Sequence, residues 1–190
     1  SATEEISSKN LYGIVEKVQA ACPLSVESQA LLSYYDDVLR LVMRNDAEFS
    51  EQVLFINEFW SRHGWSHTRV VLVLTYSPLE CKLYLLESVK KKLICALPWT
   101  NTKPVAATLV SNVRFDVEVI EDEKRKRKYH FFDQENLGIV PTWVETIVQI
   151  SKLKDRYVRQ VLGPRAHQEM QANLARLKKE SSMRKYCVIT

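Results

Sequence analysis

The stretch that decides the fold class has the sequence TRVVLVLTY and spans residues 68–76. Three of its residues are valine, two are threonine and one is tyrosine, and these β-branched and aromatic types are enriched in strands. Ser77 and Pro78 follow directly, and proline cannot donate the backbone hydrogen bond that a central strand needs. The stretch therefore predicts a β-strand that ends at Tyr76.

Further short runs with strand character lie on both sides of this stretch. One precedes it at 52–60, and a polar turn that contains Gly64 separates the two. In the run at 113–120, apolar and polar residues alternate, which is typical of a strand with one buried face. The remaining runs lie at 82–87, 92–99, 107–110 and 128–133. Seven short strands separated by turn residues predict an antiparallel sandwich or barrel rather than a parallel sheet.

The residues before the strands have helical periodicity. Apolar residues recur at helical spacing in two segments, which Pro23 separates. The second segment spans about 25–44, and Ser25 is its expected N-cap. Because the link between the segments is short, the two helices are predicted to pack as an antiparallel hairpin within residues 1–48.

Helical periodicity returns after the strands. Apolar residues recur at helical spacing from Pro141 to Leu162, and Gly163 and Pro164 are expected to end this helix. A basic amphipathic helix is predicted at 165–179. The chain therefore combines helices and an antiparallel sheet in an α+β fold.

Seven short strands followed by a helix with a tryptophan near its start, here Trp143 in VPTWVETI, resemble the layout of pleckstrin-homology domains. Within residues 53–121, the runs TRVVLVLT, KLYLL, KLICALPW and VRFDVEVI are most similar to the lipid-binding tail domain of class I myosins. The resemblance covers about 50–162 and implies a seven-stranded barrel capped by a C-terminal helix. We accordingly divide the chain into a helical hairpin (1–48), a barrel with its capping helix (49–162), and a basic helix and tail (163–190).

The resemblance implies phosphoinositide binding by basic residues in the first turn of the barrel. The first strand carries Gln52, Asn57 and Glu58 where such domains commonly have a lysine, so weak binding to anionic lipid is expected rather than tight, selective binding. The candidate lipid-binding residues are Arg62, His67, Arg69, Lys90, Lys91, Lys92, Lys124, Arg125, Lys126 and Arg127.

The distribution of charge points to an anionic partner. The net charge is +4, but residues 151–190 contain ten Lys and Arg against three acidic residues. Basic clusters on an otherwise acidic body favour binding to membrane phospholipid or to an acidic protein, although they are also compatible with a solvated loop and a solvated helix face. The basic runs lack the interleaved aromatic residues that stack on bases, so no nucleic-acid partner is predicted.

These observations lead to two hypotheses about function. The first is a non-enzymatic adaptor or scaffold domain that docks a larger protein onto anionic membrane. The alternative is a protein-interaction module that does not bind lipid, with Tyr34, Tyr35 and Trp65 as candidate contacts to an unidentified partner. One of Trp60 and Trp65 is expected to be in the core and the other at the tip of the turn.

No motif for catalysis, phosphate binding or zinc binding is present in the sequence, so no enzyme activity, cofactor or metal site is predicted. His63 and His67 are expected to be solvent-exposed residues of a turn. The four cysteines are dispersed, which favours free thiols in a reducing, cytoplasmic compartment. No secretory leader or membrane-spanning run is present, and the first residue is Ser, as expected of a piece of a longer protein.

The last residues have the form of a lipidation signal. Cys187-Val-Ile-Thr matches the pattern of a prenylation box, with basic residues directly before it. A single lipid chain binds membrane only marginally, and a basic patch supplies a second signal. Cys187 is therefore a prenylation candidate that would allow peripheral attachment to membrane, and the alternative is an ordinary chain end.

Overall fold

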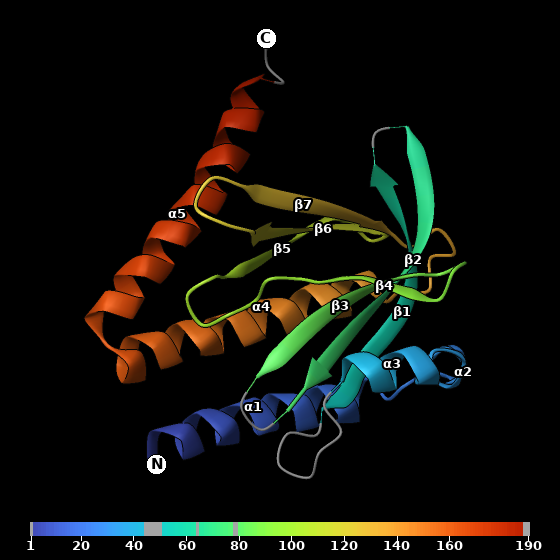
Figure 1. Cartoon of the computed structure of the whole chain (residues 1–190), viewed down its shortest axis with the longest axis horizontal. Coiled ribbons are helices and arrows are strands. Elements are labelled where there is room, and N and C mark those ends of the chain that lie inside the picture. The colour runs from blue at the N-terminus through green and yellow to red at the C-terminus, as the bar shows by residue number, and fades with distance from the viewer. Residues whose placement is uncertain (1, 44–50, 64, 78–79, 188–190) are drawn as a thin grey trace.

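The computed structural model describes residues 2–43, 51–63, 65–77 and 80–187 (Figure 1). Its helices and strands confirm the predicted α+β class. In chain order the elements are α1 (Ala2–Ala21), α2 (Val26–Tyr34), α3 (Asp36–Val42), β1 (Gln52–His63), β2 (Ser66–Tyr76), β3 (Cys81–Glu87), β4 (Lys92–Ala96), β5 (Val105–Ser111), β6 (Arg114–Ile120), β7 (Lys126–Phe132), α4 (Val140–Tyr157), the π-helical turn η1 (Val158–Leu162) and α5 (Pro164–Cys187).

The strands form one antiparallel sheet with the order β4-β3-β2-β1-β7-β6-β5. β4 and β5 are its two edges, so hydrogen bonds between the described strands do not close the sheet into a barrel. β1 joins the two halves, but it pairs with β7 only at Trp60 and Ser61. Figure 1 shows the strands of the two halves running in different directions, with α4 lying beside them. The sheet is thus strongly bent around an interior that α4 covers.

The run TRVVLVLTY lies in β2, and from Val70 to Tyr76 both faces of the strand are buried. Leu72 and Leu74 belong to the main core inside the bent sheet. Val71 and Val73 belong to a second core on the outer face. Because neither face meets water from Val70 onward, this part of the strand is a nearly continuous apolar run and does not alternate with polar residues.

The outer core is formed by the N-terminal helices. The buried side chains of Tyr35 and Leu39 pack with Val71, Val73 and other residues of the sheet. The predicted helix at 25–44 is present as α2 and α3, with a turn at Tyr35 between them. The Oγ of Ser25 accepts a hydrogen bond from the backbone N–H of Ser28 at 3.1 Å, which confirms the predicted N-cap.

α1 packs against a different part of the molecule. Its residues Leu11 and Val15 belong to the main core, together with residues of α4. α2, by contrast, contacts β1 through the outer side of the sheet. The N-terminal helices are therefore present as predicted, but α1 and the α2–α3 pair contribute their buried residues to separate cores instead of to a shared hairpin seam.

Trp143 of α4 lies at the centre of the main core. It is 1% exposed and packs near Phe55, Phe59 and Phe115. Its Nε1–H donates a hydrogen bond to Oδ1 of Asn57 at 2.8 Å, which satisfies the one polar group of a buried indole. Asn57 also donates to the Oγ of Ser28, so this amide connects α4, β1 and α2.

α4 ends at Tyr157 and continues as a π-helical turn to Leu162. Gly163 then adopts a φ of 94°, which a residue with a side chain rarely adopts, and α5 begins at Pro164. α5 extends to Cys187 and is longer than the predicted helix at 165–179. Figure 1 shows it passing beside the turn between β6 and β7.

Candidate functional site

The β1–β2 hairpin extends beyond the rest of the sheet. The pairing of β2 with β3 begins at Val70, and that of β1 with β7 begins at Trp60. Ser61 also pairs with β7, so only residues 62–63 and 65–69 form a two-stranded ribbon, in which Arg62 lies opposite His67. We call these residues the β1–β2 ribbon. It projects at the upper right of Figure 1.

The tip of this ribbon presents a tryptophan to solvent. Trp65 is 96% exposed, whereas Trp99 and Trp143 are buried and Trp60 is half-buried. Arg62 and His67 are also exposed. Of the Trp60 and Trp65 pair, Trp65 is thus the residue exposed at the tip, whereas Trp60 is half-buried and not fully in the core. The side chain of His63, which was expected to be solvent-exposed, lies outside what the structure describes.

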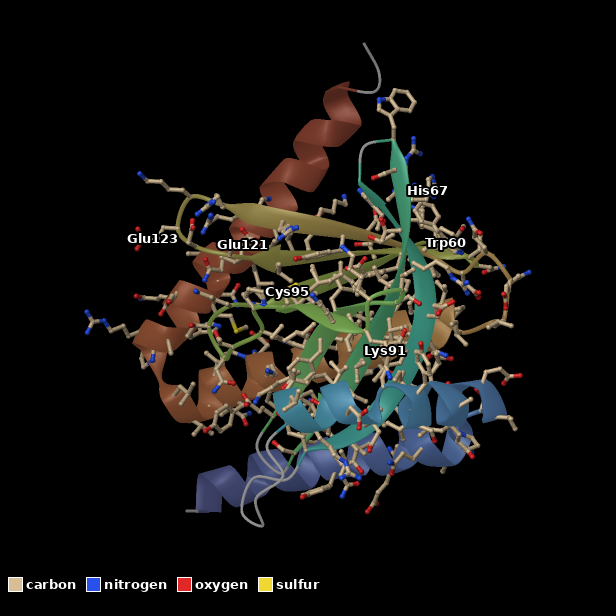
Figure 2. All side chains as sticks on the ribbon, turned by 45° about the vertical axis from the view of Figure 1, so that its right-hand side comes forward. Trp60, His67, Lys91, Cys95, Glu121 and Glu123 are labelled. Carbon is tan, nitrogen blue, oxygen red and sulfur yellow. The ribbon has the colours of Figure 1, made fainter. Side chains whose placement is uncertain are left out.

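The predicted lipid-binding residues lie in separate parts of the molecule. Figure 2 shows His67 on the ribbon, Lys91 near the N-terminal helices, and Glu121 and Glu123 by the β6–β7 turn on the opposite side. The three basic groups, at 62–69, 90–92 and 124–127, do not converge on one surface. A phosphoinositide headgroup could not contact all of them at once.

Arg69, at the base of the ribbon, contacts two side chains of β1. Its guanidinium forms an ion pair with Glu58 and lies over the ring of Trp60, 5.6 Å from the ring centroid. Its side chain is about half exposed. Arg69 is therefore held against β1 and does not point outward beside Trp65.

Most cations of the β6–β7 turn also have partners. Arg125 contacts Asp122 at 3.2 Å, and Arg127 contacts Glu121 at 3.5 Å. The Nζ of Lys126 donates to the backbone carbonyl of Arg176 at 2.6 Å, which attaches the turn to α5. Lys124 is exposed. The acidic residues that precede this run thus neutralise part of its charge, and one lysine has a structural role.

The turn between β3 and β4 contacts the N-terminal helices. Lys91 has a φ of 49°, and its Nζ lies 4.2 Å from the ring centroid of Tyr34. Lys90 and Lys92 are exposed. Of the candidate partner contacts on α2, Tyr34 is 56% exposed, but Tyr35 is 1% exposed and donates from its hydroxyl to the carbonyl of Ser88 at 3.0 Å. Tyr35 is thus a core residue whose ring is not accessible to a partner.

A cavity of about 500 Å³ lies between α2, the base of the β1–β2 ribbon and the loop that joins β7 to α4. We call it the α2–β1 pocket. Trp60, Phe132 and Leu137 supply apolar surface, and the acidic residues of its lining are Glu27, Glu58, Asp133 and Glu135. The sequence pattern does not predict this pocket. Spacing within β1 places Glu58 and Trp60 on one face, but it does not show that α2 and the loop at 133–137 meet there.

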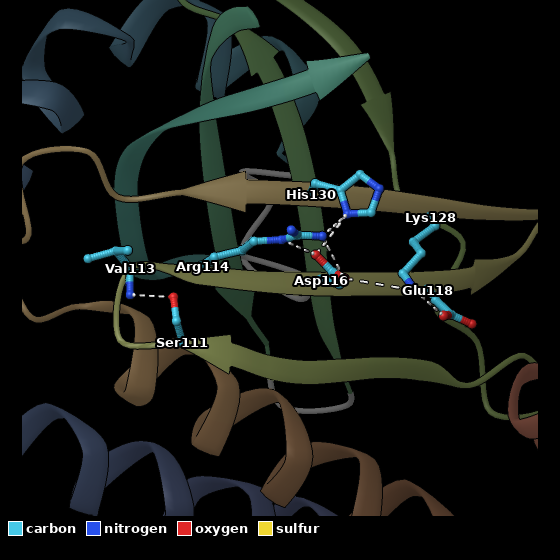
Figure 3. Close-up of polar contacts among 7 residues, drawn as sticks. All are labelled: Ser111, Val113, Arg114, Asp116, Glu118, Lys128 and His130. Carbon is cyan, nitrogen blue, oxygen red and sulfur yellow. Dashed lines mark hydrogen bonds and ion pairs between the residues drawn. The ribbon is translucent and has the colours of Figure 1, made fainter. Parts of the chain in front are cut away.

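A polar network covers the outer face of β6 and β7 (Figure 3). Asp116 is buried and accepts from His130 Nδ1 at 2.8 Å and from Arg114 Nε at 3.2 Å. The pairing of Asp116 with His130 and of Glu118 with Lys128 follows from the antiparallel register. Figure 3 shows Ser111 bonded to the backbone of Val113 and not to His130, so these side chains do not form a nucleophile, base and acid array.

A second small cavity, of about 30 Å³, lies beside Cys81 and Lys154. Burial raises the pKa of the Cys81 thiol to about 12, so the thiol stays protonated and is a poor nucleophile at neutral pH. Burial lowers the pKa of Lys154 to about 8. The ammonium of Lys154 lies 4.7 Å from the ring centroid of Trp99 and 3.5 Å from the carbonyl oxygen of Trp99.

The residues that the structure describes contain no group of three or more His, Cys, Asp or Glu side chains that could hold a metal ion. Within the same part of the chain, no helix combines the length and the apolar character needed to cross a bilayer. Cys187 is the last residue of α5, and its side chain lies outside what the structure describes, as do residues 188–190. Prenylation of Cys187 therefore stays a prediction.

Comparison with known proteins adds no family assignment. No protein-family model and no curated protein matches this chain. The similarity to pleckstrin-homology domains accordingly stays a prediction from the sequence pattern.

Proposed function

We propose that this chain is a non-enzymatic adaptor domain that docks a larger protein onto anionic membrane through the β1–β2 ribbon. The observation that carries the proposal is the 96% exposure of Trp65 at the tip of a ribbon that extends past the sheet. An indole with one polar N–H suits the boundary between headgroups and acyl chains, where tryptophan is enriched. Arg62 and His67 lie opposite each other on the same ribbon and are exposed, which supports a contact with anionic headgroups.

The expected affinity of this contact is low. Each basic residue near an anionic membrane surface contributes about 1 kcal/mol to the free energy of binding, and this contribution decreases with added salt. Because Lys91 and Lys126 have contacts elsewhere in the fold, they add little to the ribbon's own binding. Stable attachment of the larger protein would then need a second signal, and a lipidated Cys187 would supply one.

Co-sedimentation with vesicles tests this proposal. The chain without lipidation is mixed with vesicles of phosphatidylcholine, with or without phosphatidylserine and a phosphoinositide. We expect salt-sensitive binding to the anionic vesicles only. Trp65→Ala should weaken it by about tenfold, which corresponds to about 1.4 kcal/mol of lost apolar burial.

Leu41→Ala is the matched control, because Leu41 is 86% exposed but lies on α3, away from the ribbon. The control should bind like the unaltered chain. Equal loss in both variants, or no preference for anionic vesicles, would contradict docking by the ribbon.

A protein-interaction module is the second candidate function. The α2–β1 pocket favours it, because the pocket combines apolar walls with carboxylates that would repel anionic lipid. The two functions are compatible, since the pocket and the tip of the ribbon are different surfaces.

A further inference from the structure

The α2–β1 pocket has the size and walls of a site for a side chain of a partner. Its volume of about 500 Å³ falls in the range of ligand pockets. Trp60 and Phe132 lie on its sheet side, and Ala30 and Leu31 of α2 also line it. Apolar surface on two sides can bury the methylene stem of a long side chain.

The charged residues that line the pocket favour a positively charged ligand. Four carboxylate residues and one cation, Arg69, line it. Asp133 is buried and accepts a hydrogen bond from the backbone of Leu137 at 2.8 Å, so its charge supports the loop. Glu27 and Glu135 are exposed at the rim, and no partner for either is present among the residues that the structure describes.

Arg69 shows how one wall of the pocket accommodates a guanidinium. It pairs with Glu58 and lies over the Trp60 ring. A guanidinium is planar, so it can stack on an aromatic ring and bind a carboxylate at the same time, whereas an ammonium is a compact and strongly hydrated charge. The rest of the lining offers the same two elements, carboxylates from Glu27 and Glu135 and the ring of Phe132, which already has the guanidinium of Arg114 5.2 Å from its centroid.

We infer that the α2–β1 pocket binds an arginine side chain of a partner protein, with the stem against Phe132 and Leu137 and the guanidinium at Glu27 and Glu135. The partner is therefore a protein with an exposed, basic segment. This inference goes beyond membrane docking, and it uses a surface that is separate from Trp65.

Titration with single amino-acid derivatives tests the inference directly. The full chain, labelled with ¹⁵N, is titrated with N-acetyl-arginine methylamide while the indole N–H signals are followed by NMR. The Trp60 signal is assigned by its loss in Trp60→Phe. A ligand of this size should bind in the millimolar range. We expect a saturable shift of the Trp60 signal, with the signal of the buried Trp99, which lies beside Lys154 and does not line the pocket, unchanged.

Three comparisons make the result specific. The citrulline derivative has the same shape without the charge, and it should bind about tenfold more weakly because the charge-assisted hydrogen bonds are lost. The double variant Glu27→Gln with Glu135→Gln should weaken arginine binding by a similar factor. Glu123→Gln removes an exposed carboxylate at the β6–β7 turn, on the opposite side of the molecule in Figure 2, and should leave binding unchanged.

The inference is overturned if arginine produces no saturable shift at Trp60, or if citrulline binds as tightly as arginine. N-acetyl-lysine methylamide, titrated in the same way, should bind more weakly than the arginine derivative, and equal binding would overturn the assignment of a guanidinium. An equal effect of Glu123→Gln would show long-range attraction instead of a site. None of these outcomes depends on vesicle binding, so this inference and the proposed membrane docking can fail independently.

Discussion

Replacing Lys154 with methionine should stabilise the fold at neutral pH. Lys154 lies in α4, with its ammonium near the carbonyl and the ring of Trp99. No carboxylate forms an ion pair with it among the residues that the structure describes. A charged group enclosed in this way loses hydration without gaining a full partner, which disfavours its charged form.

The size of this stabilisation follows from the lowered pKa of Lys154. Burial lowers the pKa of Lys154 from the ordinary value of 10.5 to about 8. Below pH 8 the amine is protonated in both states, and the difference between the two pKa values corresponds to a cost to the native state of about 3 kcal/mol. Solvent contact of the half-buried side chain reduces this cost, and methionine retains the apolar packing. We therefore expect Lys154→Met to raise the free energy of unfolding by about 1 to 2 kcal/mol at pH 7.

The pH dependence of the stability difference between Lys154→Met and the unaltered protein is a sharper test than the stability gain at pH 7 alone. Between pH 8 and 10.5 the unfolded chain binds more protons at this site than the native chain, so the stability of the unaltered protein rises with pH. The advantage of Lys154→Met should therefore decrease to about a quarter of its neutral value by pH 10. The thiol of Cys81 and the phenol of Tyr84 also have raised pKa values, but they are present in both proteins, so their contributions largely cancel in the difference.

Urea unfolding followed by far-UV circular dichroism at pH 7 and pH 10 measures both quantities. Lys152→Met is the matched control, because Lys152 is an exposed lysine on the same helix. It should change the free energy of unfolding by less than about 0.5 kcal/mol at either pH. A loss of stability in Lys154→Met at pH 7, or a gain that does not depend on pH, would refute the assignment of a desolvated ammonium.

Three further substitutions test the packing of the fold by chemical denaturation. Leu39→Ala should lower the free energy of unfolding by about 2 to 4 kcal/mol, because Leu39 is 3% exposed under the outer core; Leu41→Ala, which alters an exposed residue of the same helix, should have almost no effect, and equal effects would mean that α3 does not pack as described. Trp143→Phe should cost about 2 to 4 kcal/mol, because it leaves a cavity and removes the partner of the buried Asn57 oxygen; a neutral effect would show that this hydrogen bond contributes nothing. Glu51→Gln should cost about 1 to 3 kcal/mol and lower the pKa of Lys82. Burial alone lowers the pKa of Lys82, but its hydrogen bonds to Glu51 and Glu80 raise it to about 12. NMR titration of the Lys82 side chain measures this pKa, and an unchanged value in Glu51→Gln would contradict the contribution of Glu51.

The sequence predicted the elements of the fold well because their signals are local. The valines and leucines of 68–76 indicated a strand, and Gly163 followed by Pro164 marked the break between α4 with its π-helical turn and α5. The Ser25 cap was also predictable, since its hydrogen bond joins residues three positions apart. Each of these features depends on residues that are close in the chain.

The arrangement of the helices around the sheet was not predictable in the same way. The apolar residues of α2 and α3 show that one face is buried, but not what covers it. Only the structure shows that Val71 and Val73 on the outer face of β2 are the partners of Tyr35 and Leu39. The expected hairpin seam between the first two helices was therefore replaced by packing on two faces of the sheet.

The candidate site was predictable in part. The turn after β1 was expected to expose one tryptophan, and Trp65 is that residue. The basic residues were grouped only by their type, and the structure separates them and pairs Arg69, Arg125 and Arg127 with carboxylates. Ion pairs such as Arg69 with Glu58 join different strands, so they depend on register and not on composition.

Depth-dependent quenching of tryptophan fluorescence tests the central claim, membrane docking through the β1–β2 ribbon, most directly. The chain is mixed with anionic vesicles whose acyl chains carry bromine at different depths, and Trp65→Phe supplies the background from the other three tryptophans. Docking through the ribbon predicts quenching that is strongest for bromine near the headgroups and absent in Trp65→Phe. Vesicle-bound protein whose fluorescence is not quenched, or is quenched equally in Trp65→Phe, would show that the ribbon does not enter the membrane.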